Sequence, residues 1–215
     1  MADDILVKRN GEVLEVTLNR PAEGNGATDF MAIDLAKLLK DPGDVKLVLL
    51  RGAGNDFCIG RASSGRLPRP EGKQGPIEAL ERRDSTECIF ECYNSFRKSP
   101  VPIIGVVQGK ALGFGCSIAA LCDVTIAAES ATFQVPEMLH NIMPTMVASA
   151  LIDRVPRKAM TYLIWSSEVI DAAQALQWGI VSKVSATASL ELNVRKVVDR
   201  MVATPRAAVH AVKEY

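Results

Sequence analysis

The sequence predicts an α/β fold in which strands come first and helices dominate the C-terminal part. Two largely apolar runs, at 45–50 and 101–107, are each followed by a turn that contains glycine. Runs that are apolar on both faces are typical of strands buried between layers, as in parallel sheets. Segments with helical spacing separate these runs, and the helical pattern predominates beyond Pro144. One α/β unit with a helical C-terminal part is therefore expected.

The composition supports a single folded unit. The chain has 215 residues, of which 48% are apolar and 23% are charged. A length of this order corresponds to one domain, or at most two, and these proportions are typical of globular proteins rather than disordered ones. Lys and Arg together number 25 and Asp and Glu also number 25. Without a basic excess, the chain is not expected to bind nucleic acid.

The cysteines and the N-terminus predict a cytoplasmic location. The five cysteines are an odd number, and their spacing matches no zinc-binding pattern, so we expect reduced thiols and no metal site. The N-terminus is acidic where a secretory signal would be basic. The longest apolar run, 118–122, is far shorter than the roughly 18 residues needed to cross a membrane. No membrane association is expected.

The first elements follow from turn residues and spacing. Residues 5–18 alternate around Asn10-Gly11, a dipeptide suited to the positive φ angles of a tight hairpin turn. Apolar residues at helical spacing follow in 30–39, and Asp41-Pro42-Gly43 ends that segment. The chain is therefore expected to begin with a hairpin and a helix.

The remaining elements are predicted in the same way. Residues 60–76 are rich in Gly, Pro, Ser and Arg and predict a loop, whereas 77–96 returns to helical spacing. A glycine turn opens an apolar helix near 114–121, and strands are expected at 123–128 and 131–135. Further helical segments are predicted at 146–154, 157–165, 171–178 and 190–202, with a short apolar run at 180–184 and the start of a helix after Pro205.

Two glycine turns carry the strongest chemical signal. One spans 57–61 after a buried strand, and the other spans 112–116 at the start of a helix. Backbone N–H groups at such turns can hold an oxyanion, and a nearby carboxylate can move a proton. Neither turn has the sequence of a phosphate-binding loop. Taken alone, each turn fits a purely structural role better than a chemical one.

The order of motifs along most of the chain is more specific than any single turn. The chain resembles the enoyl-CoA hydratase/isomerase (crotonase) family. The matching segments are 19–21, 50–54, 57–60, 102–116, 122–123, 127–133, 136–137 and 172–184.

This resemblance implies a crotonase-like spiral of repeated ββα units with a helical C-terminal region. Residues 1–185 would form the core, and 186–215 would begin a trimerisation region. A homotrimer, or a hexamer built as a dimer of trimers, is expected. Members of the family usually continue for a few helical turns beyond the position of Tyr215, so we expect either that this chain is short or that its tail is missing from the sequence.

The resemblance also implies the substrate class and a set of site residues. The substrates would be acyl-CoA thioesters, with coenzyme A part of the substrate and no other cofactor. The oxyanion-hole N–H groups map to Arg61 and Phe114, and Ile59 and Gly60 would lie near CoA.

The family's hydratases use two glutamates, and only the second is present here, as Glu137. Ser117 occupies the position of the first. Because serine cannot shuttle protons as a carboxylate does, efficient hydration is not expected, since losing one acid/base group costs about 100- to 10,000-fold. One carboxylate suffices for a 3-enoyl-CoA to 2-enoyl-CoA isomerase. The alternatives are a weak enoyl-CoA hydratase, a thioester hydrolase and a non-catalytic acyl-CoA-binding protein.

Other residues are less decisive. His140 follows Glu137 by three residues, and a surface or hydrogen-bonded structural role competes with that of an auxiliary acid or base. Cys116 is expected to be a small buried residue, and Asp123 to anchor the end of a strand. Arg61 is bulky for its position in the family, and 141–148 lacks the usual glycines, so a reshaped acyl pocket is expected.

Overall fold

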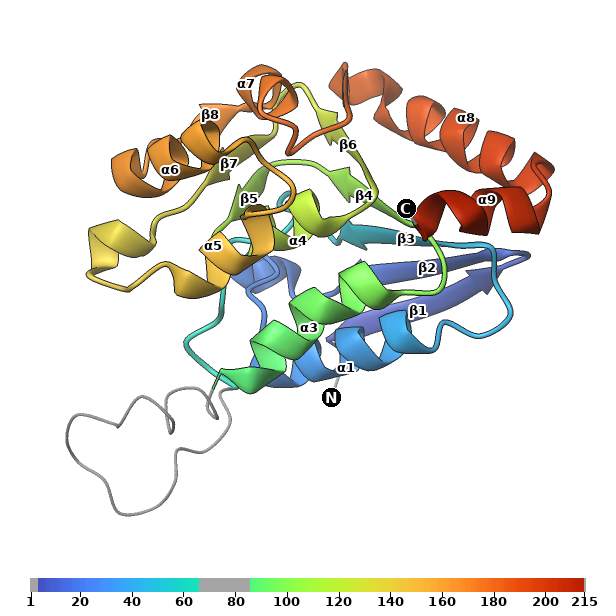
Figure 1. The fold of residues 1–215 in the computed structure, drawn as a ribbon, viewed down its shortest axis with the longest axis horizontal. Helices are drawn as coiled ribbons and strands as arrows, with labels where there is room; N and C mark the ends of the chain where they lie inside the picture. Colours follow the sequence, from blue (N-terminus) through green and yellow to red (C-terminus); the bar gives the residue numbers. More distant parts are fainter. Residues whose placement is uncertain (1–3, 66–85, 215) are drawn as a thin grey trace, which may run out of the picture.

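The computed structural model describes residues 4–65 and 86–214 (Figure 1). Strands and helices alternate along the chain, as the sequence predicts. In order, they are β1 (Ile5–Asn10), β2 (Val13–Leu18), η1 (Pro21–Glu23), α1 (Asp29–Lys40), β3 (Leu47–Gly52), α3 (Glu87–Lys98), β4 (Ile103–Val107), β5 (Lys110–Leu112), α4 (Phe114–Leu121), β6 (Val124–Ala128), β7 (Thr132–Gln134), η2 (Glu137–His140), α5 (Thr145–Leu151), α6 (Arg157–Ser166), β8 (Ile170–Asp171), α7 (Ala172–Gln177), β9 (Lys183–Ser185), η3 (Thr187–Ser189), α8 (Leu190–Ala203) and α9 (Arg206–Lys213).

The strands form two sheets. The larger sheet has the order β1-β2-β3-β4-β6-β9, and the smaller has the order β5-β7-β8. β1 and β2 pair antiparallel around the predicted turn, where Gly11 has a φ of +59°. All other neighbours in the larger sheet pair parallel. The predicted α/β class, with its N-terminal hairpin, is confirmed.

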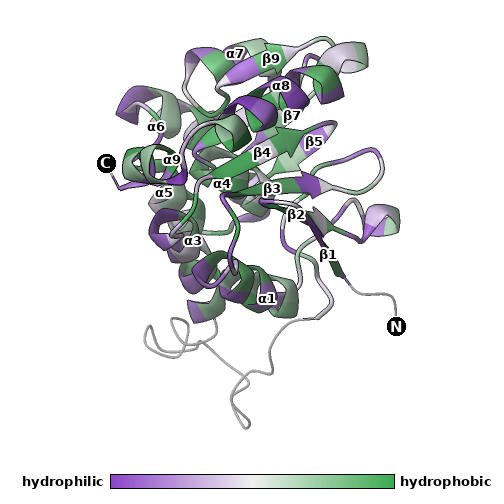
Figure 2. Cartoon of the chain, turned by 90° about the vertical axis from the view of Figure 1, so that its right-hand side faces the viewer, coloured by the Kyte–Doolittle hydropathy of each residue, from purple (hydrophilic) through white to green (hydrophobic). Residues whose placement is uncertain are grey.

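Helices cover both faces of the larger sheet, which explains its continuous apolar runs. In β3, Leu47 and Leu49 join a cluster with the α8 residues Leu190 and Val194. The alternating residues of β3 instead join the main core, to which α1, α3 and α4 contribute. The view in Figure 2 shows α1 and α3 on one side of the sheet. Side chains of β3 are therefore buried on both faces, and period-2 polarity is lost.

The helix after the hairpin ends at the predicted Asp41-Pro42-Gly43 signal and begins at a side-chain cap. Thr28 precedes α1, and its hydroxyl accepts a hydrogen bond from the N–H of Met31 at 3.0 Å. This satisfies one of the free donors at the helix start. α1 packs against α3. Most of the predicted loop at 60–76 and the start of the predicted helix at 77–96 lie outside the described residues.

α9 is held against the core by a buried lysine. Lys213 Nζ donates to the carbonyl oxygen of Phe96 at 2.7 Å and to both carboxylate oxygens of Asp123 at 2.8 Å. Asp123 also accepts from the N–H of Ile103 at 2.8 Å, which confirms that it anchors a strand end. Within the described part of the chain, every helix is too short or too polar to span a lipid bilayer.

Replacing Lys213 by Met is expected to destabilise the protein by about 2 kcal/mol, because charge-assisted hydrogen bonds to a partly buried carboxylate are lost. Urea unfolding measures this change. Lys196→Met, on the exposed side of α8, is the control and should change stability by less than about 0.5 kcal/mol. Equal midpoints for the two variants would show that Lys213 does not hold α9.

Candidate active site

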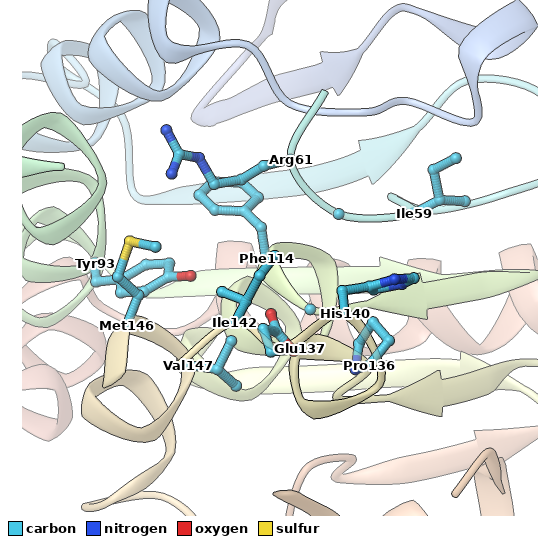
Figure 3. A pocket seen from close by; sticks show the side chains of 12 residues that line it. Ile59, Arg61, Tyr93, Phe114, Pro136, Glu137, His140, Ile142, Met146 and Val147 are labelled. Atoms are coloured by element: carbon cyan, nitrogen blue, oxygen red, sulfur yellow. The ribbon is translucent and has the colours of Figure 1, made fainter. Parts of the chain in front are cut away.

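A cavity of about 290 Å³ lies where the two glycine turns meet η2 and α5 (Figure 3). It brings together five of the six predicted site residues, all except Ser117. The lining residues are Ile59, Gly60, Arg61, Tyr93, Gly113, Phe114, Pro136, Glu137, His140, Ile142, Met146 and Val147.

Backbone hydrogen bonds join the first glycine turn to the second. The N–H of Cys58 donates to the carbonyl of Lys110 at 3.0 Å, and the N–H of Leu112 donates to the carbonyl of Cys58 at 2.9 Å. Gly115 allows this approach, because a Cβ there would lie 2.0 Å from the carbonyl oxygen of Cys58. The two turns are therefore held in a fixed relation.

The N–H groups of Arg61 and Phe114 are available to a ligand. Neither donates to an acceptor within residues 4–65 and 86–214. Phe114 is the first residue of α4, and the first N–H groups of a helix have no partner inside it. The helix dipole adds partial positive charge at this end. Two donors on neighbouring turns can thus stabilise a developing oxyanion.

Glu137 places its carboxyl group over the second glycine turn. Its Oε1 lies 2.8 Å from the position that a Cβ on Gly113 would take. Its Oε2 is buried and has no hydrogen-bond partner in the described structure. Burial raises the pKa of Glu137, and its own backbone N–H and the charge of nearby His140 lower it in part. Glu137 is therefore a half-buried cavity residue and not a solvent-facing acid at a strand end.

Ser117 and Cys116 lie behind the cavity wall. Ser117 is fully buried, and its hydroxyl donates to the carbonyl of Gly113 at 3.0 Å. Cys116 is also fully buried, and this burial raises the pKa of its thiol to about 12. The thiol stays protonated near neutral pH, as expected of a small buried residue. His140, in contrast, is exposed and lines the cavity beside Glu137.

The side chain of Arg61 is directed away from Glu137 (Figure 3). Its Nη2 donates to Oδ1 of Asp29 at 2.5 Å, and the Asp29 side chain is only 2% exposed. Asp29 is the first residue of α1. Arg61, which is bulky for its position in the family, is thus accommodated by an ion pair with Asp29. This ion pair links the first glycine turn to α1.

Sequence reasoning missed Tyr93. This residue comes from α3, and its ring stacks on that of Phe114 with centroids 5.6 Å apart and an interplanar angle of 26°. Ile142, Met146 and Val147 complete the wall from the segment that lacks the usual glycines. No three His, Cys, Asp or Glu side chains in the described ranges cluster in a way that could hold a metal ion.

The sequence of the chain matches a known family. A family model described as enoyl-CoA hydratase/isomerase matches residues 8–215. The chain belongs to this family. Its members are enzymes that process acyl-CoA thioesters, and the predicted resemblance is confirmed.

Individual relatives agree with the family assignment. Carnitinyl-CoA dehydratase of Escherichia coli K12 is 26% identical over 222 residues, covering 100% of this chain and 80% of the relative. An enoyl-CoA hydratase structure from Mycobacterium smegmatis is 27% identical with a TM-score of 0.87, covering 99% of this chain and 81% of that one. A Thermobifida fusca protein solved with acetoacetyl-CoA is 27% identical with a TM-score of 0.83, covering 98% and 85%. The predicted crotonase-like fold is confirmed.

Proposed function

We propose that this family member shifts the double bond of a 3-enoyl-CoA to give a 2-enoyl-CoA. The observation that carries the proposal is the carboxyl group of Glu137, which lies over the glycine turn that presents the N–H of Phe114. Among the described residues that line the cavity, Glu137 is the only carboxylate. A single base beside an oxyanion hole is sufficient for this reaction.

The reaction moves one proton from C2 to C4 and shifts the double bond by one position. The thioester oxygen accepts hydrogen bonds from the N–H groups of Arg61 and Phe114. Glu137 removes a proton from C2, and the electrons of that C–H bond delocalise onto the thioester oxygen and C4. The Glu137 carboxylic acid then returns the proton to C4, which leaves the double bond between C2 and C3. No atom is gained or lost.

The environment of Glu137 fits this role. A general base is most effective when its pKa approaches the working pH, and burial raises the pKa of Glu137 in that direction. Oε2 has no hydrogen-bond partner among the described residues, so the fold does not use this accepting oxygen of the carboxyl group.

A second candidate is slow hydration of a 2-enoyl-CoA or the reverse dehydration. The names of the relatives favour it, since they include a carnitinyl-CoA dehydratase and an enoyl-CoA hydratase. It ranks second because Ser117 is fully buried and donates its proton to the carbonyl of Gly113. Ser117 therefore offers no second acid or base at the cavity wall.

A hollow beside the cavity supports the placement of coenzyme A there. A hollow of about 610 Å³ shares Ile59 and Arg61 with the cavity and is also lined by Ala62, Ser63 and Lys110. Lys110 is exposed and can meet a phosphate. The Thermobifida fusca relative was solved with acetoacetyl-CoA, which supports a CoA ester as the ligand. We expect no other cofactor.

Apolar side chains exposed along 138–169 support an interface between copies of this chain, which we propose assemble as a homotrimer or a dimer of trimers. Exposed apolar surface of this kind is typical of protein interfaces. The exposed residues are Met138, Leu139, Ile142, Met143, Ile152, Tyr162, Trp165 and Val169.

The proposal is tested by incubating the protein with 2-enoyl-CoA and 3-enoyl-CoA esters and separating the products by liquid chromatography with mass detection. We expect 3-enoyl esters to change retention time at unchanged mass. A gain of one water by 2-enoyl esters, without isomerisation, would establish the second candidate instead. Release of free CoA would indicate a hydrolase, and no conversion of any ester would indicate a binding protein.

A further inference from the structure

A buried ion pair at the edge of the cavity has no part in the proposed reaction. Nη2 of Arg61 donates to Oδ1 of Asp29 at 2.5 Å. The side chain of Asp29 is 2% exposed and that of Arg61 is 15% exposed. A buried ion pair contributes little net stability, because both charges lose their hydration. Net stability therefore does not account for this pair.

The backbone of the first glycine turn is held without this pair. Ala27 binds the two neighbours of Arg61 along the chain. Its N–H donates to the carbonyl of Gly60 at 2.8 Å, and its carbonyl accepts from the N–H of Ala62 at 2.8 Å. These bonds hold the chain on both sides of Arg61, so the backbone positions its N–H. The ion pair with Asp29 instead sets where the guanidinium group lies.

With the pair intact, the guanidinium group lies away from the base. The side chain of Arg61 is directed away from Glu137 (Figure 3). Asp29 is the first residue of α1, where the helix dipole favours a negative charge. Its carboxylate is therefore a favourable partner for Arg61 at this place, and it does not itself line the cavity.

Glu137 is the alternative partner of the guanidinium group. Arg61 and Glu137 line the same cavity, and Oε2 of Glu137 has no hydrogen-bond partner among the described residues. Arg61 also lines the neighbouring hollow, but the carboxylates there have partners within the fold. Glu23 is in an ion pair, and Asp56 accepts from a backbone N–H at 2.9 Å. A guanidinium group released from Asp29 is therefore attracted to Glu137.

We propose that Asp29 is a positioning residue that acts through Arg61, because it holds the guanidinium group out of the cavity and so prevents an ion pair between Arg61 and Glu137. Such a pair would place two donors on the carboxylate and favour its ionised, less basic form. It would also fill space that the substrate needs. The inference rests on the proposed role of Glu137 as the base.

Three other titratable side chains interact with Glu137 in the described structure. They are Tyr93 on α3, Cys116 on α4 and His140 on η2. Burial and the charge of Glu137 raise the pKa of the Tyr93 phenol and of the Cys116 thiol, so both groups keep their protons. The charge of His140 lowers the pKa of Glu137 in part. All three residues are unchanged in the variants below, so a difference between variants reports the position of Arg61.

The test is the pH profile of kcat/KM for a 3-enoyl-CoA ester with the full chain, because this parameter reports the free enzyme. In Asp29→Asn, kcat/KM should fall by about 10- to 100-fold, the range of one charge-assisted hydrogen bond. The acid limb should move to lower pH, because a cation beside Glu137 lowers its pKa. Asp34→Asn is the control and should change neither property. Asp34 is also on α1, is exposed, and pairs with Lys37 at 3.1 Å.

A double variant separates positioning from a structural role. Asp29→Asn/Arg61→Met has no guanidinium group to enter the cavity, so it should recover most of the loss and return the acid limb to higher pH. Loss of a merely structural contact would not be rescued in this way. Asp29→Ser removes the same charge with a smaller side chain and should behave as Asp29→Asn does, which provides a second measurement if the first variant does not fold.

The outcomes separate this inference from the proposed function. A wild-type kcat/KM in the variants that lack the Asp29 charge would overturn the inference alone. A fall in kcat/KM with an unmoved acid limb, or a double variant as slow as Asp29→Asn, would also overturn it and leave Asp29 a structural role. Absence of isomerisation by the wild-type chain would overturn the proposed function as well.

Discussion

Replacing Glu137 by Gln is expected to lower kcat for 3-enoyl-CoA isomerisation by about 100- to 10,000-fold. The amide is close to the carboxyl group in size and polarity, but it cannot accept the C2 proton. The N–H groups of Arg61 and Phe114 are unchanged, so the affinity for CoA esters should stay within a few-fold. Steady-state kinetics and calorimetric titration together separate these two effects.

The dependence of the rate on pH should differ between the wild-type protein and Glu137→Gln. Burial raises the pKa of Glu137 in the folded state, so the active carboxylate is lost as the pH falls through that raised value. The acid limb of the wild-type rate profile should therefore lie above the usual range for glutamate. The residual activity of Glu137→Gln should lack this limb.

Stability should change in the opposite direction to activity. A carboxyl group whose pKa is raised by folding favours the folded state below its unfolded pKa, and this contribution is lost as the pH rises through the folded pKa. At neutral pH, ionised Glu137 is therefore unfavourable to folding, and Glu137→Gln should raise Tm. Glu168→Gln, on the exposed surface, is the control for both measurements. Wild-type turnover by Glu137→Gln would exclude Glu137 as the base.

The local sequence pattern was sufficient to predict those elements whose turn residues or apolar runs lie within their own segment. The hairpin at Asn10-Gly11 and the buried strands β3 and β4 follow from turn chemistry and apolar runs. β5 and β8 could not be predicted, because they contain three and two residues and gain their pairing from distant segments. These two strands form only through tertiary contacts with segments distant in the sequence.

The pairing of β5 with β7 brings the two parts of the site together. β5 pairs parallel with β7, and Leu112 lies opposite Gln134. Gly113 and Glu137 follow these two residues closely, so the pairing brings the glycine turn to the carboxyl group. The sequence motifs identified both residues, but their contact depends on a register that no local pattern encodes. Tyr93 was missed because its role depends on how α3 packs against α4.

Gly113→Ala is expected to lower kcat by about 100-fold or more, since small misplacements of reacting groups have effects of this size. Gly113 has a φ of +50° and a ψ of −108°, a conformation of type II′ turns that strongly favours glycine. An added Cβ would also lie 2.8 Å from Oε1 of Glu137. The carboxyl group must then move away from C2, or the turn must change and shift the N–H of Phe114.

The contact with Glu137 can be separated from backbone strain by comparison with Gly11→Ala. Gly11 has a similar φ of +59°, but no atom lies within 4 Å of its added Cβ. Both variants should lose about 1–3 kcal/mol of stability through strain, which urea unfolding measures. Below their unfolding transitions, only Gly113→Ala should lose turnover. Near-wild-type kcat in Gly113→Ala would mean that the carboxyl group reaches the substrate from another position. Loss of turnover in Gly11→Ala would instead attribute the effect to general strain.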